Sequence, residues 1–189
     1  KPHLIQKITT VDGDIMQQTE PLIACDDCNA DIQAPRVMSA QTAWLMNSLL
    51  QDVIRRGTGR KALSLGRSDL AGKTGTTNDQ KDAWFSGFNG ELVATHWVGF
   101  DQLAPLGKGE TGGKAALPGW IRFMGSALKG EPESVMPRPP GLVSVRIDPR
   151  TGLLADGYGG GAIFEVVPAD RVPPRSGGSY YNQPSDYDY

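Results

Sequence analysis

The chain has 189 residues, 39% of them hydrophobic and 21% charged, which suffices for one domain of ordinary size and an appendage. The formal net charge of −2 argues against a nucleic-acid partner, and no apolar run approaches the roughly 20 residues that a membrane helix needs. No signal peptide is visible, and because the first residue is Lys1 we expect a piece of a longer chain.

Two short strands and a polar loop are predicted at the N-terminus. Residues 4–16 alternate as a hairpin does, with Asp12-Gly13 at the turn. A polar loop follows over residues 19–35 and is bounded by Pro21 and Pro35.

The two cysteines of the chain, Cys25 and Cys28, form a C-x-x-C pair in this loop. A zinc site would need a second such pair or two nearby histidines, and neither is present, so we expect no metal. The surrounding acidic residues are typical of a loop, whereas a redox pair opens a helix. A disulfide that pins the loop is the preferred interpretation, and two free surface thiols are the alternative.

The middle of the chain predicts a helix, a loop and two strands in turn. Residues 37–56 carry apolar side chains at the spacing of an amphipathic helix, with Ser39 as a candidate N-cap. Residues 58–69 are expected to be a loop. The β-rich runs on either side of Asn89-Gly90 predict a hairpin over residues 82–101.

A second helix and a small β appendage are predicted toward the C-terminus. Residues 117–129 predict the helix, with Pro118 in its first turn and Gly130 after its end. Residues 137–174 read as two strands with turns between them, and residues 175–189 lack aliphatic side chains and predict a disordered tail.

The stretch AGKTGTT, residues 71–77, concentrates one lysine, two glycines and three threonines. Its Gly-Lys-Thr run matches half of a phosphate-binding loop, but the first glycine of that motif would have to stand at position 67, which is an arginine. As a strand, the stretch places Thr74 and Thr76 on one face, and Gly75 between them lets a ligand backbone approach. Such a strip suits an extended peptide that ends in a carboxylate, and an exposed strand beside a surface lysine is the alternative.

Five segments carry a resemblance to a known family: RRGTGR, AGKTGTTND, DAWFSGF, WVGFD and GGKAALPGW. In this order they resemble the C-terminal half of the transpeptidase domain of class A penicillin-binding proteins, over roughly residues 1–130. The resemblance implies an α+β fold of the penicillin-binding and serine β-lactamase-like kind, an antiparallel sheet flanked by helices, present here in part. The expected division is a transpeptidase portion over 1–136, the β appendage over 137–174 and the tail over 175–189.

The resemblance also implies a serine acyltransferase that cross-links peptidoglycan stem peptides at D-Ala–D-Ala and is acylated by β-lactams, without a cofactor. Of the family's motifs Ser-x-x-Lys, Ser-x-Asn and Lys-Thr-Gly, the third is present at Lys73. Ser64 has Arg67 where the first motif needs lysine, and an arginine does not deprotonate to act as a base. No serine is followed two residues later by asparagine. We therefore expect both missing motifs on an N-terminal part of the same protein.

The family's roles carry over only to the matching positions. Lys73 and Thr76 would be catalytic: Lys73 places positive charge near the Ser-x-Asn serine and the substrate carboxylate, and the backbone N–H of Thr76 completes the oxyanion hole. Thr74, Gly75 and Thr76 would bind the substrate, with Thr77 at the rim. The family's location implies the periplasmic face of the bacterial inner membrane, with the anchor, and usually a glycosyltransferase domain, outside this chain.

Other residues have structural interpretations that we prefer. Asp79 and Asp82 are expected to be turn or strand-end residues rather than an acid–base pair. Two other functions stay open, a β-lactamase-like hydrolase and a non-catalytic peptidoglycan-binding module. Four aromatic residues are expected to be core residues rather than substrate platforms: Trp84, Phe85, Phe88 and Trp97.

Overall fold

A computed structural model describes residues 4–25, 31–155 and 161–175. By its internal contacts the chain divides into two units, Lys1–Ser39 and Ala40–Tyr189. Cys28 and the tail from residue 176 lie outside the described residues. The Cys25–Cys28 disulfide and the disorder of the tail therefore stay predictions, as does the division at residues 136 and 174.

The first unit contains the predicted hairpin. Strand β1 (Lys7–Thr9) pairs with β2 (Ile15–Gln18) in antiparallel register. The backbone N–H of Thr10 donates to the carbonyl of Asp14 at 2.8 Å, and Gly13 has a φ of +93°, which a glycine adopts without strain. The Asp-Gly signal thus marks the turn, although the strands are shorter than the alternating pattern.

The second unit begins with helix α1 (Ala40–Arg55). The helix predicted over 37–56 is confirmed with a later start. Residues 58–69 are not wholly a loop, because Arg60–Leu65 form a short 3₁₀-helix that ends at Gly66. Gly66 has a φ of +66°, and its N–H donates to the carbonyl of Leu63, which closes the last turn.

The central sheet has three antiparallel strands in the order β3 (Ala71–Thr76), β4 (Asp82–Phe88) and β5 (Val93–Gly99). The hairpin predicted around Asn89 joins β4 to β5. Its turn is closed by the side chain of Asn89, whose Oδ1 accepts the backbone N–H of Leu92 at 2.9 Å. Strand β3 is therefore at one edge of the described sheet.

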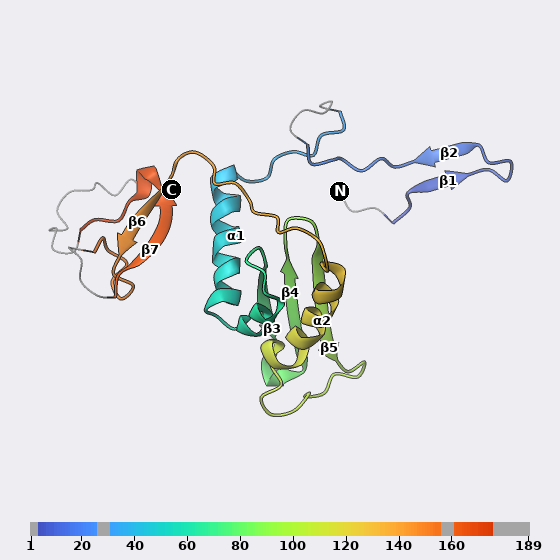
Figure 1. The fold of residues 1–189 in the computed structure, drawn as a ribbon. Helices are drawn as coiled ribbons and strands as arrows, with labels where there is room; N and C mark the ends of the chain where they lie inside the picture. The colour runs from blue at the N-terminus through green and yellow to red at the C-terminus, as the bar shows by residue number, and fades with distance from the viewer. Residues whose placement is uncertain (1–3, 26–30, 156–160, 176–189) are drawn as a thin grey trace, which may run out of the picture. The chain divides into compact units, whose positions relative to one another are not determined.

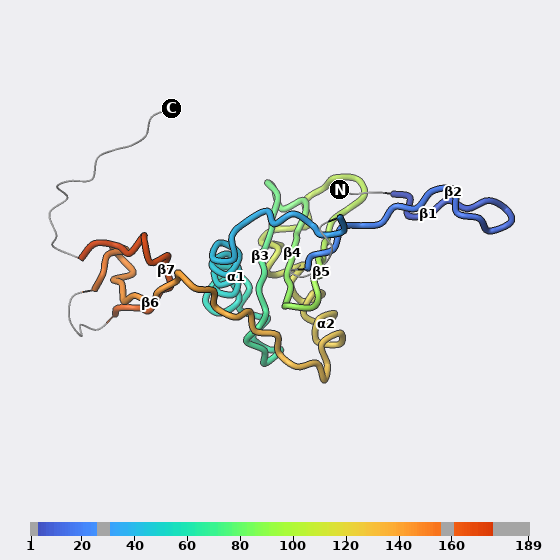
Figure 2. The backbone as a smooth tube through the Cα atoms, turned by 90° about the horizontal axis from the view of Figure 1, so that it is seen from above, coloured from blue at the N-terminus to red at the C-terminus, as the bar shows by residue number. Residues whose placement is uncertain are grey.

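The core residues of the sheet lie on one of its faces, and Figures 1 and 2 show helices α1 and α2 beside the sheet. Helix α1 contacts β3, and helix α2 (Leu117–Ala127), entered through a π-helical turn at Gly112–Ala116, contacts β4 and β5. The ring of Phe85 on β4 meets the ring of Trp120 on α2 edge-on, with centroids 4.8 Å apart, and both residues are fully buried. Ile54 of α1 joins the same cluster.

The prediction of four core aromatics is confirmed for Phe85 and wrong for the two tryptophans, while Phe88 is half-buried and lies outside the core cluster. Trp84 and Trp97 are 41% and 42% exposed, with ring centroids 6.0 Å apart. Successive side chains of a strand point to opposite faces, so the neighbour of the buried Phe85 must face away from the core. Within the described residues, the face that carries the two tryptophans is not buried.

A second small sheet follows α2. Strands β6 (Leu142–Ile147) and β7 (Ile163–Pro168) pair in antiparallel register, which agrees with the two strands predicted for the appendage. Glu165 of β7 lies 3.4 Å from Arg56 at the end of α1. Among the described residues, no helix is both long enough and apolar enough to cross a bilayer.

Candidate active-site strand

Strand β3 carries the lysine and threonine motif at the edge of the sheet. It pairs with β4 from Ala71 opposite Phe88 to Thr76 opposite Ala83. Because residues directly opposite one another share a face, Thr74 lies on the face of Phe85 and Thr76 on that of Ala83. The two threonines thus share one face, as the strand interpretation predicts.

Exposure differs along the motif. Lys73 and Thr76 are exposed, and Thr74 is half-buried. Lys73 leaves the strand on the opposite face from the threonines, and its Nζ donates to the carbonyl of Thr74 at 2.8 Å. Neither threonine is enclosed in the core, so both side chains remain within reach of a ligand at the strand edge.

Both threonine hydroxyls have partners from neighbouring segments. The Oγ1 of Thr74 lies 2.8 Å from the Oγ1 of Thr58, in the turn after α1. The Oγ1 of Thr76 accepts the backbone N–H of Gly112 at 3.0 Å, from the turn before α2. The two hydroxyls are therefore held by the turn that follows α1 and by the turn that precedes α2.

Glycines let these segments approach β3 closely. A Cβ at Gly112 would collide with the carbonyl oxygens of Gly75 and Trp84 and would lie 3.0 Å from the nitrogen of Gly75. A Cβ at Gly113 would lie 2.9 Å from the carbonyl oxygen of Thr58. Each clash is with backbone atoms, so no rotamer change can relieve it.

Thr77 belongs to the turn that joins β3 to β4. Its Oγ1 accepts the backbone N–H of Asp82 at 2.8 Å, and its own N–H donates to the carbonyl of Asp82 at 3.1 Å. The turn is tight enough that Asp79 and Gln80 both take positive φ values, 59° and 55°. The hydroxyl of Thr77 is thus already used in closing this turn.

The two aspartates here behave as turn and strand-end residues. Asp82 accepts the indole N–H of Trp97 at 2.9 Å, and Asp79, largely exposed, lies 3.5 Å from Lys81. These contacts are those of a turn residue and of a strand-end residue.

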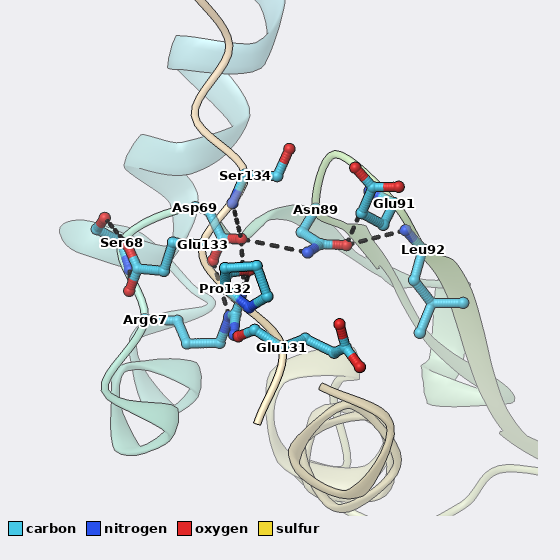
Figure 3. Close-up of polar contacts among 10 residues, drawn as sticks. All are labelled: Arg67, Ser68, Asp69, Asn89, Glu91, Leu92, Glu131, Pro132, Glu133 and Ser134. Carbon is cyan, nitrogen blue, oxygen red and sulfur yellow. Dashed lines mark hydrogen bonds and ion pairs between the residues drawn. The ribbon is translucent and has the colours of Figure 1, made fainter. Parts of the chain in front are cut away.

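The entry to β3 is fixed by a buried carboxylate, Asp69 (Figure 3). Its side chain is fully buried and accepts two hydrogen bonds from Arg67, at 2.9 and 2.7 Å. It also accepts the amide of Asn89 at 3.2 Å and the backbone N–H of Ser134 at 3.1 Å. One carboxylate thus joins the start of β3, the β4–β5 turn and the segment after α2.

Further contacts tie the same segment down. Arg67 donates to the carbonyls of Glu131 and Pro132, at 2.8 and 2.9 Å. Glu133 accepts the backbone N–H and the hydroxyl of Ser68, at 3.1 and 2.5 Å. Residues 131–134 therefore pack on the start of the motif strand, about 65 residues away in sequence.

The pKa of the Asp69 carboxyl is lowered. Burial alone would raise the pKa, because it disfavours the charged form. The hydrogen bonds from Arg67, from the N–H of Ser134 and from Asn89, with the charge of Arg67, outweigh the burial. The carboxylate is therefore ionised at neutral pH.

Comparison with known proteins agrees with this geometry. The family described as "Penicillin binding protein transpeptidase domain" matches residues 1–101, more than half of the chain. The chain belongs to the penicillin-binding protein transpeptidase family. The expected fold and the recognition of a class A penicillin-binding protein are thereby confirmed.

Relatives with this family's fold and name cover much of the chain. Penicillin-binding protein 1A of Pseudomonas aeruginosa is 58% identical over 141 residues, which is 75% of this chain and 17% of that protein. Penicillin-binding protein 1A of Neisseria gonorrhoeae is 44% identical over 142 residues, with the same coverage. A crystal structure of penicillin-binding protein 1A from Haemophilus influenzae covers 93% of this chain and 30% of its own, with a TM-score of 0.76 at 36% identity. The chain thus spans about one sixth of the length of these curated relatives.

The sequence reasoning missed one match to the penicillin-binding protein nucleophile motif. Ser126 to Lys129 read SALK, which has the Ser-x-x-Lys spacing. Ser126 is exposed in the last turn of α2, and this end of α2 lines a depression of about 570 Å³ together with Asn89, at the β4–β5 turn. That end of the sheet pairs with Ala71, at the opposite end of β3 from Thr76. This match is therefore badly placed to attack a ligand held at Thr76.

A second depression in the described residues, like the first, is lined by no residue of the motif. It has a volume of about 310 Å³ and is lined by Leu63, Arg67 and Leu70, among others. In the described part of the chain, no group of three or more acidic, histidine or cysteine side chains is arranged to hold a metal ion. The motif itself lies on β3, at an edge of the described sheet.

Proposed function

We propose that the chain forms the Lys-Thr-Gly side of the active site in a serine D-Ala–D-Ala transpeptidase. Such an enzyme takes an acyl group from one peptidoglycan stem peptide, passes it to an amine of another, and is acylated by β-lactams. The observation that carries the proposal is β3, an edge strand of this family with Lys73 exposed and two threonine hydroxyls on one face.

In this proposal the strip receives the anionic end of the substrate. Thr74 and Thr76 donate their hydroxyl hydrogens to the terminal carboxylate, and charge-assisted hydrogen bonds of this kind are stronger than neutral ones. Lys73 leaves the strand on the opposite face, and its long side chain would reach around the strand edge to add positive charge there. The N–H of Thr76 completes the oxyanion hole, where loss of one donor costs about 10²–10³ in kcat.

The remaining machinery is proposed to lie on an N-terminal part of the same protein. That part would supply the Ser-x-x-Lys nucleophile, the Ser-x-Asn serine, and the membrane anchor that keeps the enzyme at the periplasmic face of the inner membrane. The open face that carries Trp84 and Trp97 fits this proposal, because two large aromatic residues leave apolar surface for further polypeptide to cover.

Labelling of the intact gene product by a fluorescent penicillin tests the proposal. Lys73→Ala and Thr76→Val should each reduce the second-order rate constant of acylation at least tenfold, whereas Lys61→Ala, an exposed lysine on the 3₁₀-helix, should leave it unchanged. Unchanged acylation in both site variants would refute the assigned roles. A stable adduct fits a transpeptidase, and rapid release of hydrolysed penicillin would instead indicate a β-lactamase-like hydrolase.

A further inference from the structure

The turn after α1 places a second hydroxyl against the motif strand. Thr58 stands between Gly57 and Gly59, and its Oγ1 lies 2.8 Å from the Oγ1 of Thr74. The two residues come from different elements, 16 positions apart in the sequence. No substrate role is assigned to Thr58 by the motif alone.

The position of Thr58 is set by its flanking glycines. The N–H groups of Gly57 and Gly59 both donate to the carbonyl of Val53 in the last turn of α1, at 3.1 and 2.9 Å. A Cβ at Gly57 would lie 2.9 Å from that same oxygen, and one at Gly59 would lie 3.2 Å from it. Gly113 packs on the other side, against the carbonyl of Thr58. The turn is therefore held firmly at the helix end and against β3.

The direction of the hydrogen bonds to Thr74 and Thr76 decides whether each hydroxyl can donate its hydrogen to a ligand. A hydroxyl has one hydrogen to donate and can accept from others. Thr76 accepts from the N–H of Gly112, so its own hydrogen is left for an anion. Thr74 is in the same situation only if Thr58 is the donor in their contact.

We infer that Thr58 is a positioning residue, whose hydroxyl donates to Thr74 and thereby directs the Thr74 hydrogen toward the carboxylate of the bound ligand. The inference rests on the proposed function, because it assumes that Thr74 binds that carboxylate. With Thr58 and Gly112 as the two donors behind the strand, both motif threonines present their hydrogens outward. An anionic ligand then meets two donors that are oriented before it binds.

The test compares ligands with and without the carboxylate, using the intact gene product. The second-order acylation rate constants for benzylpenicillin and for its methyl ester give an acid-to-ester ratio. Thr58→Val should lower this ratio about threefold to tenfold, the value of one hydrogen bond, with little change for the ester. Thr58→Ser, which keeps the hydroxyl, should restore the ratio. Thr95→Val is the matched control, since it breaks a similar hydroxyl pair with Ser86, at 3.0 Å, on the opposite face of the sheet.

The variants at Thr74 separate the two proposals. Thr74→Val should lower the ratio, and the double variant Thr58→Val/Thr74→Val should lower it no further. A normal ratio in Thr58→Val beside a lowered one in Thr74→Val would overturn the role of Thr58 and leave the proposed function standing. A normal ratio in Thr74→Val would overturn the carboxylate role of Thr74 and the inference with it. Equal losses of the acylation rate constant for acid and ester in Thr58→Val would show a merely structural role. Additive losses of the acid-to-ester ratio in the double variant would show that Thr58 acts independently of Thr74. Either result would overturn the inference.

Discussion

Replacing Gly112 by alanine should damage the proposed active-site strand, although Gly112 itself is given no role in binding the ligand. The added Cβ would overlap the carbonyl oxygens of Gly75 and Trp84, which are backbone atoms paired across β3 and β4. Ordinary contacts between heavy atoms are about 3.5–4.0 Å, so the turn must retreat from the strand by about 1 Å.

A shift of the turn by this distance would break a hydrogen bond to Thr76. Its hydrogen bond from the N–H of Gly112 is 3.0 Å long and would stretch beyond the range of a hydrogen bond. A misplacement of about 1 Å in a catalytic arrangement costs about 10²-fold in rate, and overpacking costs about 1–3 kcal/mol of stability. We therefore expect Gly112→Ala to slow acylation by about two orders of magnitude.

The assay is fluorescent-penicillin acylation of the intact protein, together with the temperature at which penicillin binding is lost. Gly125→Ala is the control, because its Cβ would lie 3.0 Å from the end of the flexible Leu65 side chain, within helix α2. Alanine there should be tolerated and can add up to about 1 kcal/mol of helix stability. Wild-type acylation and thermal stability in Gly112→Ala would refute the close packing inferred for this turn.

Three further predictions concern the parts that hold the strand. Asp69→Ala should cost about 1.5–3 kcal/mol of unfolding free energy, because it removes the buried carboxylate that accepts hydrogen bonds from Arg67, Asn89 and Ser134; a loss under about 1 kcal/mol in thermal or urea unfolding would contradict this. The pKa of Asp69 is lowered in the folded state, so its stabilisation is present above the ordinary aspartate pKa of about 3.9 and is lost as pH falls through the folded value. The stability difference between wild type and Asp69→Asn should accordingly be constant from pH 7 to 5 and shrink only below about pH 4, and shrinkage near pH 6 would assign it to another group. Gly87→Ala should cost about 1–3 kcal/mol, since its Cβ would lie 2.5 Å from the ring of Trp120, and an unchanged unfolding temperature would show that the ring moves freely.

Local patterns in the sequence predicted most of the elements near the motif. The periodicity of α1, the Asn-Gly signal before β5 and the proline at the start of α2 each act over a few residues, and each element is present. Strand alternation also put Thr74 and Thr76 on one face. It could not tell which face is covered, because that depends on where the helices pack, and the tryptophans were assigned to the core for this reason.

Contacts between distant segments were beyond reach of the sequence patterns. Nothing in the sequence near Asp69 indicates that it accepts hydrogen bonds from Asn89 and Ser134. Thr58 and Gly112 likewise read as ordinary turn residues, and only the structure shows their contacts with Thr74 and Thr76 of β3. One signal was available and was missed: two glycines at 112–113 and two around Thr58 mark places where backbones meet closely. The Ser126-to-Lys129 match shows the opposite error, since a short motif without its spatial context carries little weight.

The hydrogen bonds that join Arg67 and Asp69 to residues 131–134 affect where this domain can be truncated. Helix α2 ends at Ala127, yet residues 131–134 supply Arg67 and Asp69 with hydrogen-bond partners. A protein shortened just after Gly130 would keep α1, α2 and the three strands of the central sheet and still lose the hydrogen bonds that hold the start of β3, the proposed ligand-binding strand. Any excised transpeptidase fragment meant to bind penicillin should therefore run through Ser134.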